Sequence, residues 1–224
     1  MSDILLQAKN IHKGYKIGKR EISVLRGINL EVVKGEWLAV LGASGSGKTT
    51  LLNILGALEA PDSGEVLFMG KSYPSMNRAQ MSEFRKNSVG FIFQSYHLVP
   101  ELTVIENVML PGMIAGRIGA ELEKDAQEML EKAGLGHRTG HKPSELSGGE
   151  QQRAAIARSL INSPSMILAD EPTGNLDSAT GSEILDIFTK LRKINTTIIM
   201  VTHDRDVSAC ADRTVHVVDG KIVD

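Results

Sequence analysis

The sequence predicts an α/β fold: a mostly parallel sheet with flanking helices, an N-terminal antiparallel β layer and an inserted helical subdomain. Two observations lead to this prediction. After residue 36, short apolar runs alternate with helix-compatible segments, as in parallel sheets that helices cover on both faces. Before that point, apolar and polar residues alternate, which favours antiparallel strands. We expect one domain over residues 1–224, with the helical insert at about 95–160.

The first third of the chain contains the predicted antiparallel layer and the first strand, loop and helix. Turn-prone residues around Gly14 and Gly18 separate two alternating stretches, and a glycine-rich turn follows a short apolar run. The expected elements are strands at 5–11 and 22–32, a strand at 37–41, a helix at 49–58, and a turn and strand at 61–70.

In the remainder of the chain, the sequence pattern predicts the helical insert and the rest of the parallel sheet. Charged, helix-compatible stretches mark the insert, and apolar runs then alternate with a helix again. The expected elements are a strand at 89–93, helices at 120–133 and 150–160, a strand at 166–170, a helix at 178–193, a strand at 197–201 and a strand pair at 214–223.

Composition narrows the function classes. With 42% hydrophobic residues, 23% charged residues and a net charge of -2, the chain has the composition of a soluble protein. The near-neutral charge argues against nonspecific nucleic-acid binding. Cys210 is the only cysteine, which excludes an intramolecular disulfide and fits a reducing compartment. Since the apolar runs are shorter than the ~20 residues that cross a bilayer, any membrane role requires a partner.

A phosphate-binding loop follows the predicted strand at 37–41. The stretch GASGSGKT matches the pattern GxxxxGK[ST] between a strand and a helix, which is a specific signal for a P-loop NTPase core. Glycines let backbone N–H groups point inward, and the helix adds its positive end. Lys48 is expected to neutralise β and γ phosphate oxygens and Thr49 to ligate Mg²⁺. The predicted nucleotide-binding residues here are Gly42, Ala43, Ser44, Gly45, Ser46, Gly47, Lys48, Thr49 and Thr50.

Two acidic residues lie at the end of the apolar run 166–170: Asp170 is its last residue and Glu171 follows it. Asp170 is expected to be the metal-side acid, since a parallel sheet presents ligands at the carboxyl ends of its strands. Glu171 follows directly, and neighbouring side chains of an extended chain face opposite ways, so we expect a different task for it. We assign Glu171 as the base that orients the attacking water. The alternative is a solvated acidic turn before Pro172.

A phosphate loop leaves GTPases, kinases and helicases open, and the stretch LSGGE at 146–150 separates them. It resembles the signature of ATP-binding-cassette (ABC) transporter ATPases, and further motifs resemble that family in the expected order. Gln94 is similar to the family's glutamine loop and Asn175-Leu-Asp177 to its D-loop. His203 resembles its switch histidine and Tyr15 its adenine-stacking aromatic. The resemblance covers essentially the whole chain.

The resemblance implies an ATPase that binds ATP and Mg²⁺ between two protomers. The helix start after Ser147 suits a second phosphate cradle, which in the family closes over ATP of the opposite protomer in a twofold dimer. Taken singly, the same residues have plainer interpretations: a flexible turn, a surface amide, a strand-end histidine or an exposed aromatic. The implied catalytic residues are Glu171, His203, Gln94 and Lys48; the metal ligands are Thr49, Gln94 and Asp170; the further nucleotide contacts are Tyr15, Ser147, Gly148, Gly149 and Asp177.

Longer phrases narrow the family. They resemble the subgroup of lipoprotein-releasing, macrolide-export and cell-division ATPases, and include GFIFQSYHLVPELTVIENVMLP and DEPTGNLDS. This resemblance implies integral membrane permease subunits as partners, a homodimer on ATP binding, and a peripheral place on the cytoplasmic side of the inner membrane. Two functions stay open: lipoprotein release or efflux of a hydrophobic molecule, and mechanical signalling in a cell-wall or division complex. The expected partner contact is the set of apolar residues after Gln94, namely Tyr96, Leu98, Val99, Leu102 and Val104.

Overall fold

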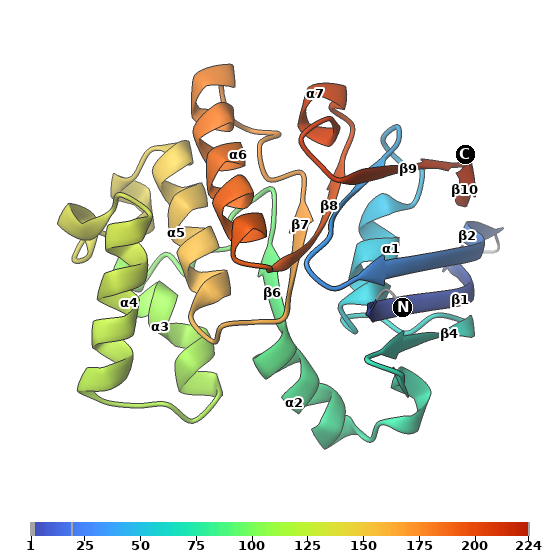
Figure 1. Ribbon diagram of the computed structural model, residues 1–224, viewed down its shortest axis with the longest axis horizontal. Coiled ribbons are helices and arrows are strands. Elements are labelled where there is room, and N and C mark those ends of the chain that lie inside the picture. Colours follow the sequence, from blue (N-terminus) through green and yellow to red (C-terminus); the bar gives the residue numbers. More distant parts are fainter. Residues whose placement is uncertain (1–2, 19, 224) are drawn as a thin grey trace.

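The computed structural model describes residues 3–18 and 20–223, which form two β-sheets and a group of helices (Figure 1). The antiparallel sheet has the strand order β2-β1-β4-β5. The other sheet has the order β10-β9-β3-β8-β7-β6 and is parallel except for its β9–β10 edge. The strands are β1 (Ile4–Ile17), β2 (Arg20–Val33), β3 (Trp37–Leu41), β4 (Ser63–Phe68), β5 (Lys71–Ser72), β6 (Val89–Ile92), β7 (Met166–Asp170), β8 (Thr197–Thr202), β9 (Arg213–Val218) and β10 (Lys221–Val223). The predicted α/β fold with an N-terminal antiparallel layer is confirmed.

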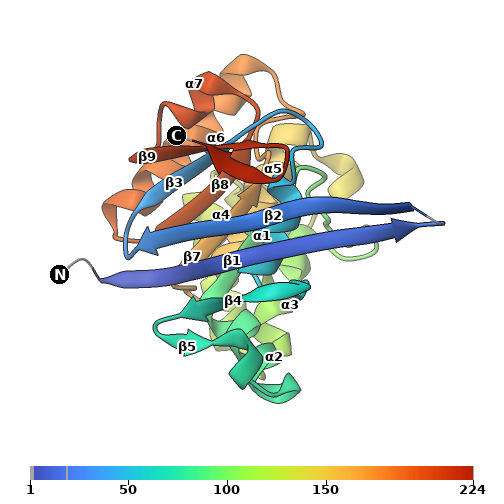
Figure 2. The same cartoon turned by 90° about the vertical axis from the view of Figure 1, so that its right-hand side faces the viewer.

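The helices divide between the sheet and a separate group. In Figure 1, α3, α4 and α5 lie together at one end of the molecule and the antiparallel sheet lies at the other, while Figure 2 shows β1 and β2 running side by side across it. The helices are α1 (Lys48–Leu55), α2 (Arg78–Ser88), α3 (Val104–Ile114), α4 (Ala120–Lys132), α5 (Gly148–Leu160), α6 (Ser178–Lys193) and α7 (Arg205–Ser208), with short 3-10 turns at Tyr73–Ser75, Gly136–Arg138 and Pro143–Glu145.

Both faces of the parallel sheet are buried, because successive residues of a strand face opposite ways. On β8, Ile199 and Val201 pack into the core shared with α1 and the antiparallel sheet. Ile198 and Met200 pack into a second core with Phe188 of α6. This arrangement explains the continuous apolar runs of the central strands and holds their carboxyl ends at one edge.

The helical group has a core of its own. Its buried members extend from Val104 to Ile161 and include Val108 of α3, Leu130 of α4 and Ala154 of α5. These helices occupy the stretch where the sequence predicts an insert at about 95–160. Its behaviour as a separate subdomain stays a prediction.

Three predicted boundaries were wrong, each for a local reason. Gly14 does not form a turn: it pairs with Ser23 inside β1, so the two strands are longer than expected. Helix α1 ends at Leu55, since Gly56 caps it. Helix α5 begins at Gly148 rather than at Glu150, because Ser147 is its N-cap.

Three helices, α2, α3 and the four-residue α7, were not predicted. Pro111 and Gly112 inside α3 weaken its helical pattern. The usable signal was the capping box that starts each of the two longer helices, Thr103 with Glu106 in α3 and Asn77 with Gln80 in α2. Within residues 3–18 and 20–223, none of the helices is both long and apolar enough to span a membrane.

Candidate functional site

The loop between β3 and α1 has the geometry of a phosphate cradle. Gly45 and Gly47 have φ of 77° and 104°, values that glycine tolerates and that turn successive N–H groups inward. A Cβ at Gly42 would lie 2.4 Å from the carbonyl oxygen of Val217, so β9 packs directly under the loop. Gly220 N also donates to Ser46 O at 3.2 Å. The cradle is therefore held in shape by the neighbouring strand β9 and by the turn between β9 and β10.

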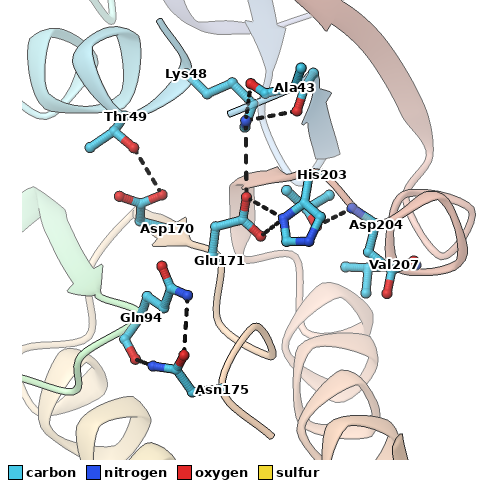
Figure 3. A network of polar contacts seen from close by, with 12 residues as sticks. Ala43, Lys48, Thr49, Gln94, Asp170, Glu171, Asn175, His203, Asp204 and Val207 are labelled. Carbon is cyan, nitrogen blue, oxygen red and sulfur yellow. Dashed lines mark hydrogen bonds and ion pairs between the residues drawn. The ribbon is translucent and has the colours of Figure 1, made fainter. Parts of the chain in front are cut away.

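Lys48 lies at the centre of this loop. Its side-chain nitrogen donates to the carbonyl oxygens of Gly42 at 2.8 Å and Ala43 at 2.9 Å (Figure 3). The residue is 6% exposed, so its positive charge is held within the loop rather than in solvent. A polyphosphate in the cradle would meet both the inward N–H groups and this ammonium group.

The two acids at the end of β7 face different partners, as predicted. Asp170 Oδ1 accepts a hydrogen bond from Thr49 Oγ1 at 3.2 Å. Burial raises the pKa of the Asp170 carboxyl, and the charge of Glu171 raises it further, so a cation beside this group would relieve a desolvated negative charge. Glu171 has a left-handed φ of 46°, which turns the chain sharply after the strand and redirects its side chain.

Glu171 is held between two basic groups. The two oxygens of its carboxylate lie 2.8 Å and 2.9 Å from Nδ1 of His203, and Oε1 lies 4.0 Å from Nζ of Lys48 (Figure 3). His203 directly follows β8, just as Glu171 follows the neighbouring β7. The carboxylate thus lies beside the phosphate cradle with its direction fixed by the histidine.

Eleven of the predicted residues lie around one hollow of about 680 Å³. It is lined by Lys48, Thr49, Gln94, Asp170, Glu171 and His203, together with the loop residues Ala43, Ser44, Gly45, Gly47 and Thr50. They come from the carboxyl ends of four parallel strands, which the sequence pattern predicted to meet. With Lys48 as the cation and Glu171 as the base beside the phosphate loop, this arrangement can bind a polyphosphate and direct a water molecule at it.

Tyr15 lies outside this lining. It is on β1, 38% exposed, and its hydroxyl donates to Glu59 Oε2 at 2.7 Å. Lys13 reaches the same glutamate at 3.1 Å and lies 5.5 Å from the centre of the tyrosine ring. Glu59 therefore orients the ring. This contact joins positions 44 residues apart, and no sequence pattern predicted it.

The signature residues are also elsewhere on the chain. Among the described residues that line the hollow, none comes from 147–149 or is Asp177. Ser147 and Asp177 are exposed N-caps of α5 and α6: Ser147 Oγ accepts from Glu150 N at 3.3 Å, and Asp177 Oδ1 accepts from Thr180 N at 3.0 Å. A Cβ at Gly149 would lie 2.3 Å from Thr180 Cγ2, so the two helix starts are packed together. The predicted second phosphate cradle therefore lies apart from the hollow that the same chain builds.

Comparisons with known proteins agree with this arrangement. The profile of the family described as "ABC transporter" matches residues 25–174. The lipoprotein-releasing system ATP-binding protein LolD of Geobacter metallireducens is 48% identical over 220 residues, 98% of each chain. The macrolide export ATP-binding/permease protein MacB of Chlorobaculum tepidum is 46% identical over 98% of this chain, which spans 34% of that relative.

A solved structure extends the similarity to three dimensions. It is described as the dimeric post-hydrolysis state of the ATP-binding cassette MJ0796 bound to ADP and Pi. It matches this chain with a TM-score of 0.91 and 41% identity, over 98% of this chain and 97% of that one. The chain therefore belongs to the ABC transporter family and carries its ATP-binding, ATP-hydrolysing cassette.

Proposed function

We propose that two copies of this chain close around ATP and that hydrolysis powers a membrane-embedded permease in lipoprotein release or efflux of a hydrophobic molecule. The observation that carries the dimer is the separation of Lys48 from Ser147: a helix start suited to phosphate lies outside the hollow that the same chain builds. A second copy related by a twofold axis can supply it. The names of the LolD and MacB relatives support the class of work.

Each polar group of the hollow has a task in this proposal. Lys48 exchanges its loop carbonyl partners for phosphate oxygens of ATP. Glu171 accepts a proton from water as the water oxygen bonds to the γ-phosphorus and the bond from that phosphorus to the bridging oxygen breaks. His203 uses Nδ1 to hold Glu171, which leaves Nε2 as the nitrogen able to face the γ-phosphate.

The residues present also fit Mg²⁺. Thr49 Oγ1 and Asp170 Oδ1 are hard oxygen donors within 3.2 Å of each other, and the carboxyl is desolvated enough to favour a cation. Gln94 lies on the same hollow with an amide oxygen. When bound, Mg²⁺ supplies charge neutralisation at the β and γ phosphates.

The permease contact needs correction. Val104 is completely buried in the helical core, so the prediction is wrong for that residue. Leu98 packs against the same core and is partly buried, while Val99 is 36% exposed, and for these two the contact stays a prediction. A hollow of about 480 Å³ lies beside them, between α2, β6 and α3. Its lining includes the exposed apolar residues Leu58 and Ile114, and the basic Arg85 and Arg158. We propose that a short helix of the permease docks here.

Changing Leu58 and Ile114 to Asp should abolish association with the permease. The two side chains are 49% and 67% exposed, so the substitutions should leave the fold and ATP affinity nearly unchanged. The measurement is co-purification from solubilised membranes, with the captured membrane protein identified by mass spectrometry, beside ATP titration of the isolated chain. Ile194→Asp is a matched control, since Ile194 is 72% exposed and caps the end of α6. Weakened ATP binding in the double variant, or full association with the permease, would contradict this docking site.

The proposal places the protein at the cytoplasmic face of the inner (plasma) membrane. It is peripheral there and held by the permease alone, without contact to nucleic acid. The helical insert, attached to the permease through the docking hollow, is proposed to move as a unit and carry Ser147 toward or away from the other protomer.

A further inference from the structure

Gln94 is held by the side chain of Asn175, the first residue of the stretch that resembles the D-loop. Its amide nitrogen Nε2 donates to Oδ1 of Asn175 at 3.3 Å (Figure 3). In return, Nδ2 of Asn175 donates to the backbone oxygen of Gln94 at 3.0 Å. One asparagine therefore makes contact with both the main chain and the side chain of the glutamine, across 81 residues of sequence.

This pair of bonds decides which way the Gln94 amide points. A backbone carbonyl oxygen can only accept, so it must face the NH₂ group of Asn175. The oxygen of Asn175 then faces Gln94, and it can be met only by the NH₂ group of that glutamine. Gln94 Oε1 is left for the opposite side, toward Asp170, as Figure 3 shows. An oxygen in that direction is the ligand that Mg²⁺ or a catalytic water requires.

Asn175 also lies where three functional segments touch. It is between Glu171 and Asp177, in a turn closed by the bond from Leu176 N to Thr173 O at 3.1 Å. A Cβ at Gly148 would lie 3.5 Å from Leu176, the residue after Asn175, and 2.9 Å from the hydroxyl of Tyr96. The glutamine loop, the loop after Glu171 and the signature helix are therefore in direct contact within one protomer.

We propose that Asn175 is a positioning residue, which presents the Gln94 amide oxygen to the metal and water side of the site and ties the glutamine loop to the loop that carries Asp177. The inference rests on the proposed role of Gln94. It goes beyond that role by assigning the orientation of the amide to one side chain. Movement of either loop is then passed to the other through two hydrogen bonds.

Replacing Asn175 by Ala should lower kcat by about tenfold, since two hydrogen bonds that orient Gln94 are lost. KM for ATP should change little, because Lys48 and the phosphate loop are untouched. A second readout does not depend on turnover: the ratio of the Kd for ADP in EDTA to the Kd in Mg²⁺, measured by calorimetry on the full chain. This ratio should fall in the variant. Asn87→Ala is the control, because Asn87 is exposed and pairs with Glu83 on α2.

The decisive arm combines Asn175→Ala with Gln94→Ala. If Asn175 acts through Gln94, then Asn175→Ala adds nothing to the fall that Gln94→Ala already causes in the ADP ratio. An equal further fall in the double variant would mean that Asn175 acts independently, which would overturn the inference while the role of Gln94 stands. An unchanged ADP ratio in Asn175→Ala would also overturn the inference and leave the role of Gln94 standing. An unchanged ratio in Gln94→Ala alone would instead overturn the proposed metal role of Gln94, and the inference with it.

Discussion

Replacing Glu171 by Gln should leave ATP bound while kcat falls by about 10²- to 10⁴-fold, the range expected when a general base is removed. The amide keeps the shape of a side chain that is only 14% exposed and that fits between Lys48 and His203. What it loses is the negative charge and the capacity to take a proton. The measurements are steady-state ATP hydrolysis and nucleotide retention.

The same substitution should not weaken ATP binding. The Glu171 carboxylate lies 4.0 Å from the lysine ammonium, where it competes with phosphate for that positive charge. Its neutralisation removes the competitor and a like charge beside the γ-phosphate, so an ATP-bound dimer should accumulate in size-exclusion chromatography. Glu183→Gln is the control, since Glu183 is an exposed partner of Arg153 outside the hollow. Hydrolysis at the wild-type rate in Glu171→Gln would require another base, with His203 the first candidate.

Elements were predicted well where their hydrophobic pattern and their capping residues indicate the same boundaries. The helix at 178–193 was predicted with both boundaries correct, since Asp177 caps its start and basic residues fill its last turn. Helix α3 was missed because Pro111 and Gly112 weaken its pattern, while part of its support is not periodic: buried Asn107 bonds to the chain at Val99 and Thr103 and holds the segment before the helix. Propensity alone cannot report such a tertiary contribution.

The site was predictable where the sheet topology determines the position of a residue, and less predictable where a polar side-chain contact does. Parallel strands bring their carboxyl ends to one edge, so residues placed after those ends had to meet. The contacts of Glu59 with Tyr15 and of Asn175 with Gln94 join distant positions through polar side chains that no periodicity marks. Apolar character after Gln94 suggested an interface, but a core and an interface use the same residue types, and Val104 belongs to the core.

The second large effect is the recovery of activity from two inactive variants. Lys48→Ala should remove phosphate neutralisation in the loop. Ser147→Arg should place a bulky cation at the exposed start of α5, where the opposite protomer is expected. Ser147→Ala is the control for this second variant, because it loses the cap to Glu150 N, at a cost of about 1 kcal/mol, without blocking the surface. Each inactive variant alone should hydrolyse ATP at background.

Mixing the two variants in equal amounts, with subunit exchange, should restore roughly a quarter of all sites. Random pairing makes half of the dimers mixed. In a mixed dimer both defects fall in one site, where the loop lacking Lys48 faces the damaged signature, and the other site pairs an intact loop with an intact signature. Recovery would lie below a quarter if hydrolysis needs both sites. Zero recovery, with exchange demonstrated by labelled protomers, would argue against shared sites that turn over independently. Wild-type activity in Ser147→Arg alone would go further, because the hollow around Lys48 would then be complete within one chain.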